Sequence, residues 1–205
     1  TENTHTTPDL LALYQSLAEI EAEFQTRSIN QDQPHPVALE VTSHALDQKR
    51  VEGLSFAVTL FNNLNRDHLD YHKTMEAYAE AKRRLFFEYR AASSVINHDD
   101  LEGQKILSEL SKSDPHRRLI SYGQREANYE NHLLIDQLRL HHQGLSFTLH
   151  YRGEKYPIES ALYGGFNAYN LTAMIGALLA FEIPMEEIVS IIPKITHVKG
   201  RMELI

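Results

Sequence analysis

The 205-residue chain contains no cysteine. A disulfide scaffold, a zinc site with cysteine ligands and a cysteine nucleophile are therefore all excluded. No apolar run approaches about 18 residues, so the sequence predicts no transmembrane helix. Basic blocks are also missing: Lys and Arg total 20 against 28 for Asp and Glu, which gives a net charge of −8. This balance argues against a nucleic-acid-binding surface.

Both common phosphate-binding motifs, GxGxxG and GxxxxGK[ST], are absent. Residues 1–8 show no signal-peptide pattern and no initiator Met, and residues 201–205 stop in mid-pattern. We therefore expect a fragment of a longer protein. The absence of cysteine fits a reducing cytoplasm, so we expect that protein to be cytoplasmic. With 42% hydrophobic residues and no long linker, the chain should form one large domain.

Short apolar runs alternate with helical patterns over the first 122 residues. Strands are expected at 37–41, 56–61, 92–96 and 118–122. Helices are expected from Thr7 onward, with Thr7 as N-cap and Pro8 in the first position, and then at 44–50, 71–89 and 101–111. This alternation predicts an α/β fold with a parallel sheet.

The pattern changes in the last third of the chain. Apolar and polar residues alternate over 145–152 and similarly over 137–141, with Gly144 and Gly153 marking turns. Helical spacing returns from Asn167 onward. The sequence thus predicts a mostly parallel sheet flanked by helices, with a small antiparallel β meander.

Lys82 lies on the apolar face of a predicted helix. Tyr78, Lys82, Leu85 and Tyr89 recur at steps of four, three and four, so they share one helical stripe. A lysine there either extends its ammonium to water or has its chemistry changed by burial. Burial lowers the pKa of a lysine and so produces the neutral amine that carbon dioxide can carbamylate. The pattern alone favours the lysine that reaches water.

Glu40 and His68 are candidate metal ligands. Glu40 ends an otherwise apolar predicted strand, where α/β sheets bind ligands, and a carboxylate suits a hard cation. His68 follows the next strand, with Asp67, Asp70 and His72 around it. A solvent-exposed Glu40 and a polar loop in which Asp70 caps the next helix explain the same pattern. A zinc hydrolase built on His68, His72 and an acid is disfavoured, because no HExxH motif is present.

Other polar residues have both a binding and a structural interpretation. Arg50 suits a carboxylate or phosphate, with Thr42 and Gln48 near it, but it could also be a helix C-terminal cation. Thr6 and Thr7 precede a helix, and Asn167 and Asn170 could cap another. Arg201 follows a glycine and could contact a phosphate.

At these residues the sequence closely resembles the Mur ligase family. It is most similar to the members that add the third amino acid of the peptidoglycan stem peptide. The matching stretches span nearly the whole chain: 6–9 (TTPD), 39–46 (LEVTSHAL) with Gln48 and Arg50, 61–72 (FNNLNRDHLDYH), 81–82 (AK), 95–100 (VINHDD), 165–170 (GFNAYN) and 200–203 (GRME). The chain departs from the family at Thr42, where a serine is expected, and in a longer loop over 28–36.

The resemblance implies a role for each of these residues. Glu40 and His68 would bind Mg²⁺, assisted by a carbamylated Lys82, and this trio would be catalytic. The residues implied to contact the nucleotide–dipeptide substrate are Thr6, Thr7, Thr42, Gln48 and Arg50. Asn167, Asn170 and Arg201 would face ATP. These implications outweigh the structural interpretations of Glu40, His68 and Lys82.

The resemblance also implies an ATP-dependent ligase of peptidoglycan precursor synthesis. It would join meso-diaminopimelate, or else L-lysine, to UDP-MurNAc-L-Ala-D-Glu through an acyl phosphate. Residues 1–205 would be its central ATPase-type domain, without the phosphate-loop segment, the N-terminal UDP-binding domain and the C-terminal domain. We expect this fragment to be inactive alone, and the enzyme to be a monomer that binds neither nucleic acid nor membrane. Alternatives are a folylpolyglutamate synthase-like ligase and a non-catalytic binding module.

Overall fold

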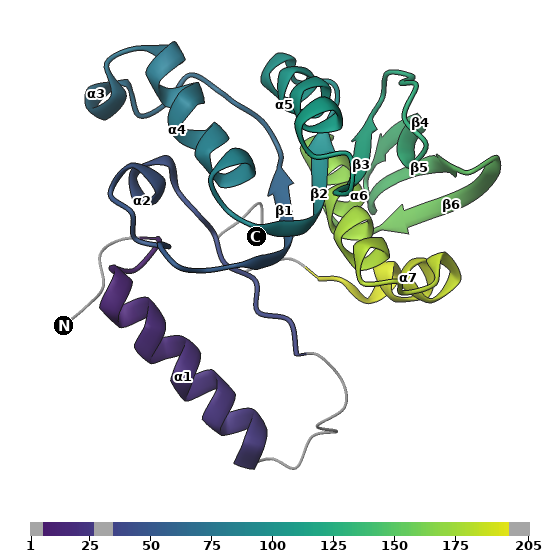
Figure 1. Cartoon of the computed structure of the whole chain (residues 1–205). Helices are drawn as coiled ribbons and strands as arrows, with labels where there is room; N and C mark the ends of the chain where they lie inside the picture. The colour runs from purple at the N-terminus through teal and green to yellow at the C-terminus, as the bar shows by residue number, and fades with distance from the viewer. Residues whose placement is uncertain (1–5, 27–34, 197–205) are drawn as a thin grey trace. The chain divides into compact units, whose positions relative to one another are not determined.

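The computed structural model describes residues 6–26 and 35–196. They fall into two compact units (Figure 1). The first unit comprises residues up to Ser55 together with Arg66–Tyr89, and the second comprises Phe56–Asn65 with the residues from Arg90 onward. Because the chain passes back and forth between the units, no single linker separates them in the sequence.

The second unit is built on one six-stranded sheet whose strand order follows the chain. Its strands are β1 (Phe56–Phe61), β2 (Ala91–Asn97), β3 (Arg118–Gly123), β4 (His132–His141), β5 (Gly144–Tyr151) and β6 (Glu154–Ser160). Strands β1 to β4 are parallel to their neighbours, whereas β4, β5 and β6 form an antiparallel meander. The predicted mostly parallel sheet with an antiparallel meander is confirmed.

Strands β3 and β4 are parallel although no helix connects them. Parallel neighbours usually need a crossover of a dozen or more residues. Here the paired positions run only from Ser121 opposite His132 to Gly123 opposite Leu134. The chain therefore needs to turn back over a short distance before β4 continues past the end of β3. This geometry lets a parallel sheet pass directly into the meander.

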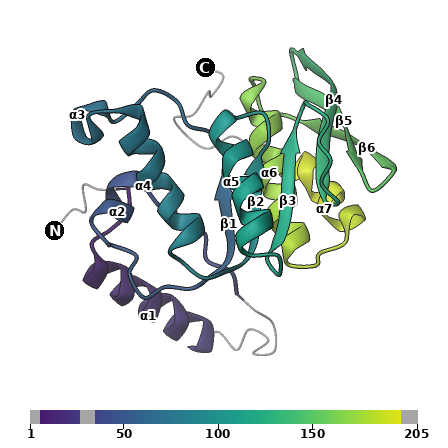
Figure 2. The ribbon, with the colours of Figure 1, turned by 45° about the horizontal axis from the view of Figure 1, so that its top comes forward.

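Helices cover both faces of this sheet (Figure 2). A Cβ built on Gly103 in α5 (Leu101–Ser113) would lie 3.4 Å from Ile96, whereas one on Gly176 in α6 (Phe166–Ala180) would lie 2.7 Å from Val95. Because Val95 and Ile96 are consecutive strand residues, they point to opposite faces. The main core lies on the α6 face, where α7 (Met185–Ile191) adds to it, and includes Ile120, Leu133, Leu149, Leu171, Ile175 and Ile188.

The described part of the first unit is helical. Its helices are α1 (Leu10–Thr26), α2 (Ser43–Asp47), α3 (Leu69–His72) and α4 (Met75–Phe87). The Thr74 hydroxyl caps α4 by accepting a hydrogen bond from the Ala77 N–H. Tyr78 and Tyr89 are buried and Lys82 is half-buried, which confirms that Lys82 lies on the inward stripe. No helix within 6–26 and 35–196 is long and apolar enough to span a membrane.

Two local predictions are wrong. Residues 37–41 are not a strand: they have no regular secondary structure, and most of their side chains are exposed. A strand exists only through pairing with a neighbour, and none of the six described strands pairs with this segment. Thr7 does not cap α1 either. Asp9 does, because its carboxylate accepts from the Ala12 N–H at 3.0 Å.

Candidate functional site

Thr7 ties together the residues predicted to bind substrate. Its hydroxyl donates to the Glu40 carbonyl at 2.7 Å and accepts from the Thr42 N–H at 3.1 Å. The Thr42 hydroxyl caps α2 by accepting from the Ala45 N–H at 3.2 Å. Thr7 is fully buried, whereas Thr6 beside it is exposed. The buried hydroxyl therefore fixes the irregular 40–42 segment against the start of the chain's first helix.

Arg50 extends this network. Its guanidinium donates to the Thr7 carbonyl at 3.0 Å and to the Gln48 side-chain oxygen. The Gln48 amide in turn donates to the Tyr71 hydroxyl at 3.3 Å. The structure thus brings Thr7, Thr42, Gln48 and Arg50 together. These contacts of Arg50 are not those of a cation placed on the last carbonyls of α2.

His68 and Lys82 share one aromatic neighbour, the buried ring of Tyr78. The imidazole of His68 meets this ring edge-on, with ring centroids 5.7 Å apart. The Lys82 ammonium lies 5.6 Å from the centroid of the same ring, within cation–π range. His68 also has a left-handed backbone, with φ of 55°. Such a conformation is uncommon outside glycine, and His68 adopts it at the N-cap position of α3.

Glu40 is not placed in this group. Glu40 is exposed, and it contacts Thr7 through its backbone carbonyl rather than through its carboxylate. Glu40 was predicted to be a metal ligand because it would end a strand, but residues 37–41 are not a strand. Over residues 6–26 and 35–196, no three His, Asp or Glu side chains gather closely enough to hold a metal ion. The zinc alternative therefore gains no support, and the metal role of Glu40 stays a prediction.

Two further histidines join this cluster: His72, which the sequence suggested only as a ligand of the disfavoured zinc site, and His44, which was not identified from the sequence. The ring of His44 lies 5.0 Å from that of His68 and 5.4 Å from that of His72. His72 stacks on Tyr78 at 5.4 Å and shares a 2.9 Å hydrogen bond with the Ser43 hydroxyl. Burial, and then the neighbouring His44, lowers the pKa of His72. The i, i+4 spacing of His68 and His72 was the sequence pattern that could have indicated a histidine cluster.

In the second unit, three asparagines form a chain of side-chain amides. Asn62, just after β1, donates to the side-chain oxygen of Asn170 at 2.9 Å, and Asn170 donates to that of Asn167 at 3.1 Å. Asn167 donates to the Tyr163 carbonyl at 2.7 Å. Neither α6 asparagine is an N-cap, since Gly165 occupies that position. The structure thus brings Asn167 and Asn170 together and adds Asn62, which no sequence pattern indicated.

Two aspartates brace the surrounding loops of the second unit. Asp100 caps α5 through the Glu102 and Gly103 N–H groups and also accepts from the Leu64 N–H at 2.9 Å. Asp99 accepts from two backbone N–H groups that follow β3 and from the Tyr169 hydroxyl at 2.7 Å. Burial, together with the bond to Asp99, raises the pKa of Tyr169. The contacts of Asp99 and Asp100 therefore stabilise these loops and the start of α5.

Two predictions concern residues that the structure does not describe. Arg201 lies outside the described residues, as do residues 28–34 of the longer loop. Their roles stay predictions.

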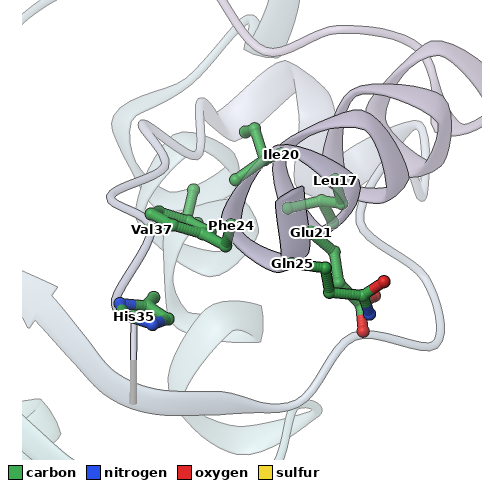
Figure 3. Close-up of a pocket in the computed structure, with 7 residues that line it drawn as sticks. All are labelled: Leu17, Ile20, Glu21, Phe24, Gln25, His35 and Val37. Atoms are coloured by element: carbon green, nitrogen blue, oxygen red, sulfur yellow. The ribbon is translucent and has the colours of Figure 1, made fainter. Parts of the chain in front are cut away.

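A hollow of about 510 Å³ lies in the first unit, beside α1 (Figure 3). Phe24 stacks on His35 at its rim, with ring centroids 4.4 Å apart. Its lining contains none of the candidate site residues and consists of Leu17, Ile20, Glu21, Phe24, Gln25, His35 and Val37. The hollow therefore plays no part in the site described above.

Comparison with known proteins identifies the family. Residues 1–178 match the Mur ligase middle domain. Over 99% of its length the chain is 36% identical to the UDP-N-acetylmuramoyl-L-alanyl-D-glutamate–2,6-diaminopimelate ligase of Chromobacterium violaceum, of which it spans 38%. A solved structure described as that ligase matches with a TM-score of 0.73 and 33% identity, over 82% of this chain and 34% of the other.

A second solved structure, described as an FPGS–AMPPCP complex, covers 94% of this chain and 52% of its own, with a TM-score of 0.57. At 14% identity it shows the shared fold alone. The family match, by contrast, extends over most of the sequence and over the candidate residues from Thr6 to Asn170. The chain therefore belongs to the Mur ligase family, of which it carries the middle domain.

Proposed function

We propose that this chain is the central part of an ATP-dependent ligase that joins 2,6-diaminopimelate to UDP-N-acetylmuramoyl-L-alanyl-D-glutamate. The observation that supports this most is the 36% identity, over 99% of the chain, to a ligase of that name. The chain spans only 38% of that relative. L-Lysine is the second candidate for the added amino acid, and the relative's name favours diaminopimelate.

The proposed reaction has two steps. A carboxylate oxygen of the dipeptide attacks the γ-phosphorus of ATP, ADP leaves, and an acyl phosphate forms. The amino group of the incoming amino acid then attacks the acyl carbon, phosphate leaves, and the nitrogen loses a proton. Such catalysis depends mainly on positioning and on neutralising phosphate charge. The side chains proposed here serve those two needs.

The network around Thr7 would hold the nucleotide–dipeptide. Arg50 offers a planar guanidinium suited to a carboxylate or phosphate, and Thr42 and Gln48 lie next to it. Exposed Thr6 would complete this set. Asn167, Asn170 and Arg201 would contact ATP. The amide chain in the second unit supports this assignment, because Asn167 is half-buried and Asn170 is exposed.

Mg²⁺ would be held by Glu40 and His68 with a carbamylated Lys82 beside them. When bound, the ion would neutralise charge on the phosphates. The oxygen donors fit, since Glu40 offers a carboxylate and a carbamylated Lys82, half-buried on the Tyr78 ring, would offer further oxygens; the imidazole of His68 is a less common ligand for Mg²⁺. His68 and Lys82 would be oriented by Tyr78. A cytoplasmic, monomeric enzyme that binds neither nucleic acid nor membrane remains our prediction.

A folylpolyglutamate synthase-like ligase shares the fold, but the likeness to such a structure rests on 14% identity. A non-catalytic binding module would not require Lys82 and His68 to share a buried ring. We therefore retain the Mur ligase assignment.

The test uses the full-length ligase that contains this chain. Lys82→Ala should abolish most activity, and acetate or formate at high concentration should partly restore it by supplying the missing negative charge. Lys82→Arg should stay inactive with or without acetate, because guanidinium remains protonated. Lys112→Ala, which removes an exposed lysine of α5, is the matched control and should retain activity. Steady-state rates decide: a nearly wild-type Lys82→Arg enzyme refutes the carbamate role.

A further inference from the structure

The chain of three asparagine amides in the second unit has a fixed direction. A side-chain amide can be placed with its oxygen and nitrogen in either order, unless a partner accepts only one order. The Tyr163 carbonyl can only accept, so the Asn167 nitrogen must face it, at 2.7 Å. The Asn167 oxygen therefore faces Asn170, and the same reasoning turns the Asn170 oxygen toward Asn62.

The other end of the chain agrees with this direction. The Asn62 oxygen accepts from the Tyr122 hydroxyl, and this phenol lies within the buried core. Burial, and then the nearby Asp100, raises the pKa of Tyr122, so the phenol keeps its proton and can donate. The Asn62 backbone is also held, because its carbonyl accepts from the Asn97 amide at 2.7 Å. The Tyr163 carbonyl at one end therefore specifies the orientation of every amide in the chain. The Tyr122 hydroxyl at the other end, which can donate or accept and also lies 3.2 Å from the Phe61 carbonyl, is compatible with that orientation.

Adenine and guanine differ at the position that such an amide would read. Adenine presents a donor, its N6 amino group, where guanine presents an acceptor, O6. An asparagine with its oxygen fixed toward that position accepts from adenine and repels guanine, and a reversed amide does the opposite. Within this row of three amides, the Asn170 oxygen accepts one hydrogen bond and its nitrogen donates one. One lone pair and one N–H therefore remain for a ligand.

We propose that Asn62 is a specificity-determining positioning residue, which holds the Asn170 amide in the direction that Asn167 imposes and thereby supports the preference of the ligase for adenine over guanine nucleotides. This inference rests on the proposed ATP site at Asn167 and Asn170. Asn62 acts through Asn170 and does not itself touch the base.

Asn62→Asp tests the direction with almost no change in shape. A carboxylate only accepts, so it cannot donate to the Asn170 oxygen. If the Asn170 amide keeps its orientation, its oxygen faces the introduced carboxylate, and both groups can only accept. If Asn170 reverses, its oxygen faces the Asn167 oxygen, which the Tyr163 carbonyl holds in place. In both cases the fixed presentation to the base is lost.

The experiment measures kcat and KM of the full-length ligase with ATP and with GTP. For Asn62→Asp we expect kcat/KM for ATP to fall about tenfold, the effect of one base-edge pair, through KM rather than kcat. The ATP-to-GTP preference should fall by a similar factor. Asn63→Asp is the matched control, because it adds the same charge at the adjacent exposed side chain, and its preference should equal that of the wild type.

Tyr122→Phe is the second variant. It removes the phenol that faces the Asn62 oxygen without adding charge, and it should lower the ATP-to-GTP preference in the same direction but by less. An unchanged preference in folded Asn62→Asp overturns the inference. If that variant does not fold, an unchanged preference in Tyr122→Phe overturns it instead.

Asn170→Ala separates this inference from the proposed function. If it leaves KM for ATP unchanged, the proposed ATP site is wrong, and the inference falls with it. If it raises KM for ATP while Asn62→Asp keeps the wild-type preference, the site is right and only the role of Asn62 is wrong.

Discussion

Gly103→Ala is the most direct test of how α5 is seated on the sheet of the second unit. A Cβ at this position would lie 2.0 Å from the backbone oxygen of Asn97 and 3.1 Å from its carbonyl carbon. A carbon and an oxygen in contact normally stay about 3.3 Å apart. The backbone at the end of β2, or the first turn of α5, must therefore move by more than about 1 Å.

The expected magnitude is the difference of two terms. Alanine is favoured over glycine inside a helix by about 1 kcal/mol. Overpacking against backbone costs about 3 kcal/mol or somewhat more, because a carbonyl cannot rotate away as a flexible side chain can. The net loss is then about 2 to 3 kcal/mol, which lowers Tm by roughly 5 to 10 °C for a domain of this size.

The assay is thermal unfolding followed by circular dichroism, with Gly165→Ala as the control. Gly165 is the N-cap of α6, close to the start of a helix as Gly103 is, but a Cβ there would meet only Leu138, at an ordinary 3.8 Å. Its Tm should stay within about 2 °C of the wild type. If the two variants unfold at the same temperature, the close approach of α5 to β2 described here is wrong.

Two further predictions concern Tyr78 and His132. Tyr78→Leu removes the ring on which His68 and Lys82 pack, so kcat should fall roughly 10-fold to 100-fold, whereas Tyr78→Phe should stay near wild type in steady-state assays; equal rates for the two variants would contradict the orienting role. Burial lowers the pKa of His132, so the unfolded state binds its proton more readily and the free energy of unfolding should decrease as pH falls below about 6.5. Urea titrations at neutral and mildly acidic pH should show a smaller decrease for His132→Gln, and an unchanged one would refute this.

The elements of the second unit were largely predictable because their signals are local. The prediction for β1 matches residue by residue, and β2, β3 and α5 differ from their predicted ranges by at most two residues at either end. Each is a short apolar run or a helical pattern between polar turns, and each is buried where the pattern requires it. The antiparallel meander was predicted from period-two alternation with glycine at the turns, but β4 was expected only over 137–141 and no range was predicted for β6.

Residues 37–41 show that a local sequence pattern does not reveal whether a segment pairs with a strand. This segment is as apolar as β1, yet it is not a strand. Composition reports that a segment can be buried, but a strand also needs a partner, and no described strand pairs with residues 37–41 although β1 lies at an edge of the sheet. The placement of Glu40 depended on that strand, so the error passed from the fold to the site.

The contacts that define the site are mostly non-local. Asn62 and Asn170 are 108 residues apart in sequence, and Thr7 and Arg50 are 43 apart. No periodicity relates such pairs. Only the family resemblance indicated that Thr7, Thr42, Gln48 and Arg50 act together, and it did not indicate Asn62, His44 or Tyr78.

The wrong cap assignment for Thr7 changes how its hydroxyl can be used. Because Asp9 caps α1, the Thr7 hydroxyl is available to Glu40 and Thr42, and its proton goes to the Glu40 carbonyl. An anionic substrate needs donors, and Thr7 can offer it only a lone pair. The Thr42 hydroxyl accepts from Ala45 and so keeps its own proton for an acceptor. In the proposed substrate site around Arg50, Thr42 would therefore be the better phosphate ligand, and Thr7 would hold it in position.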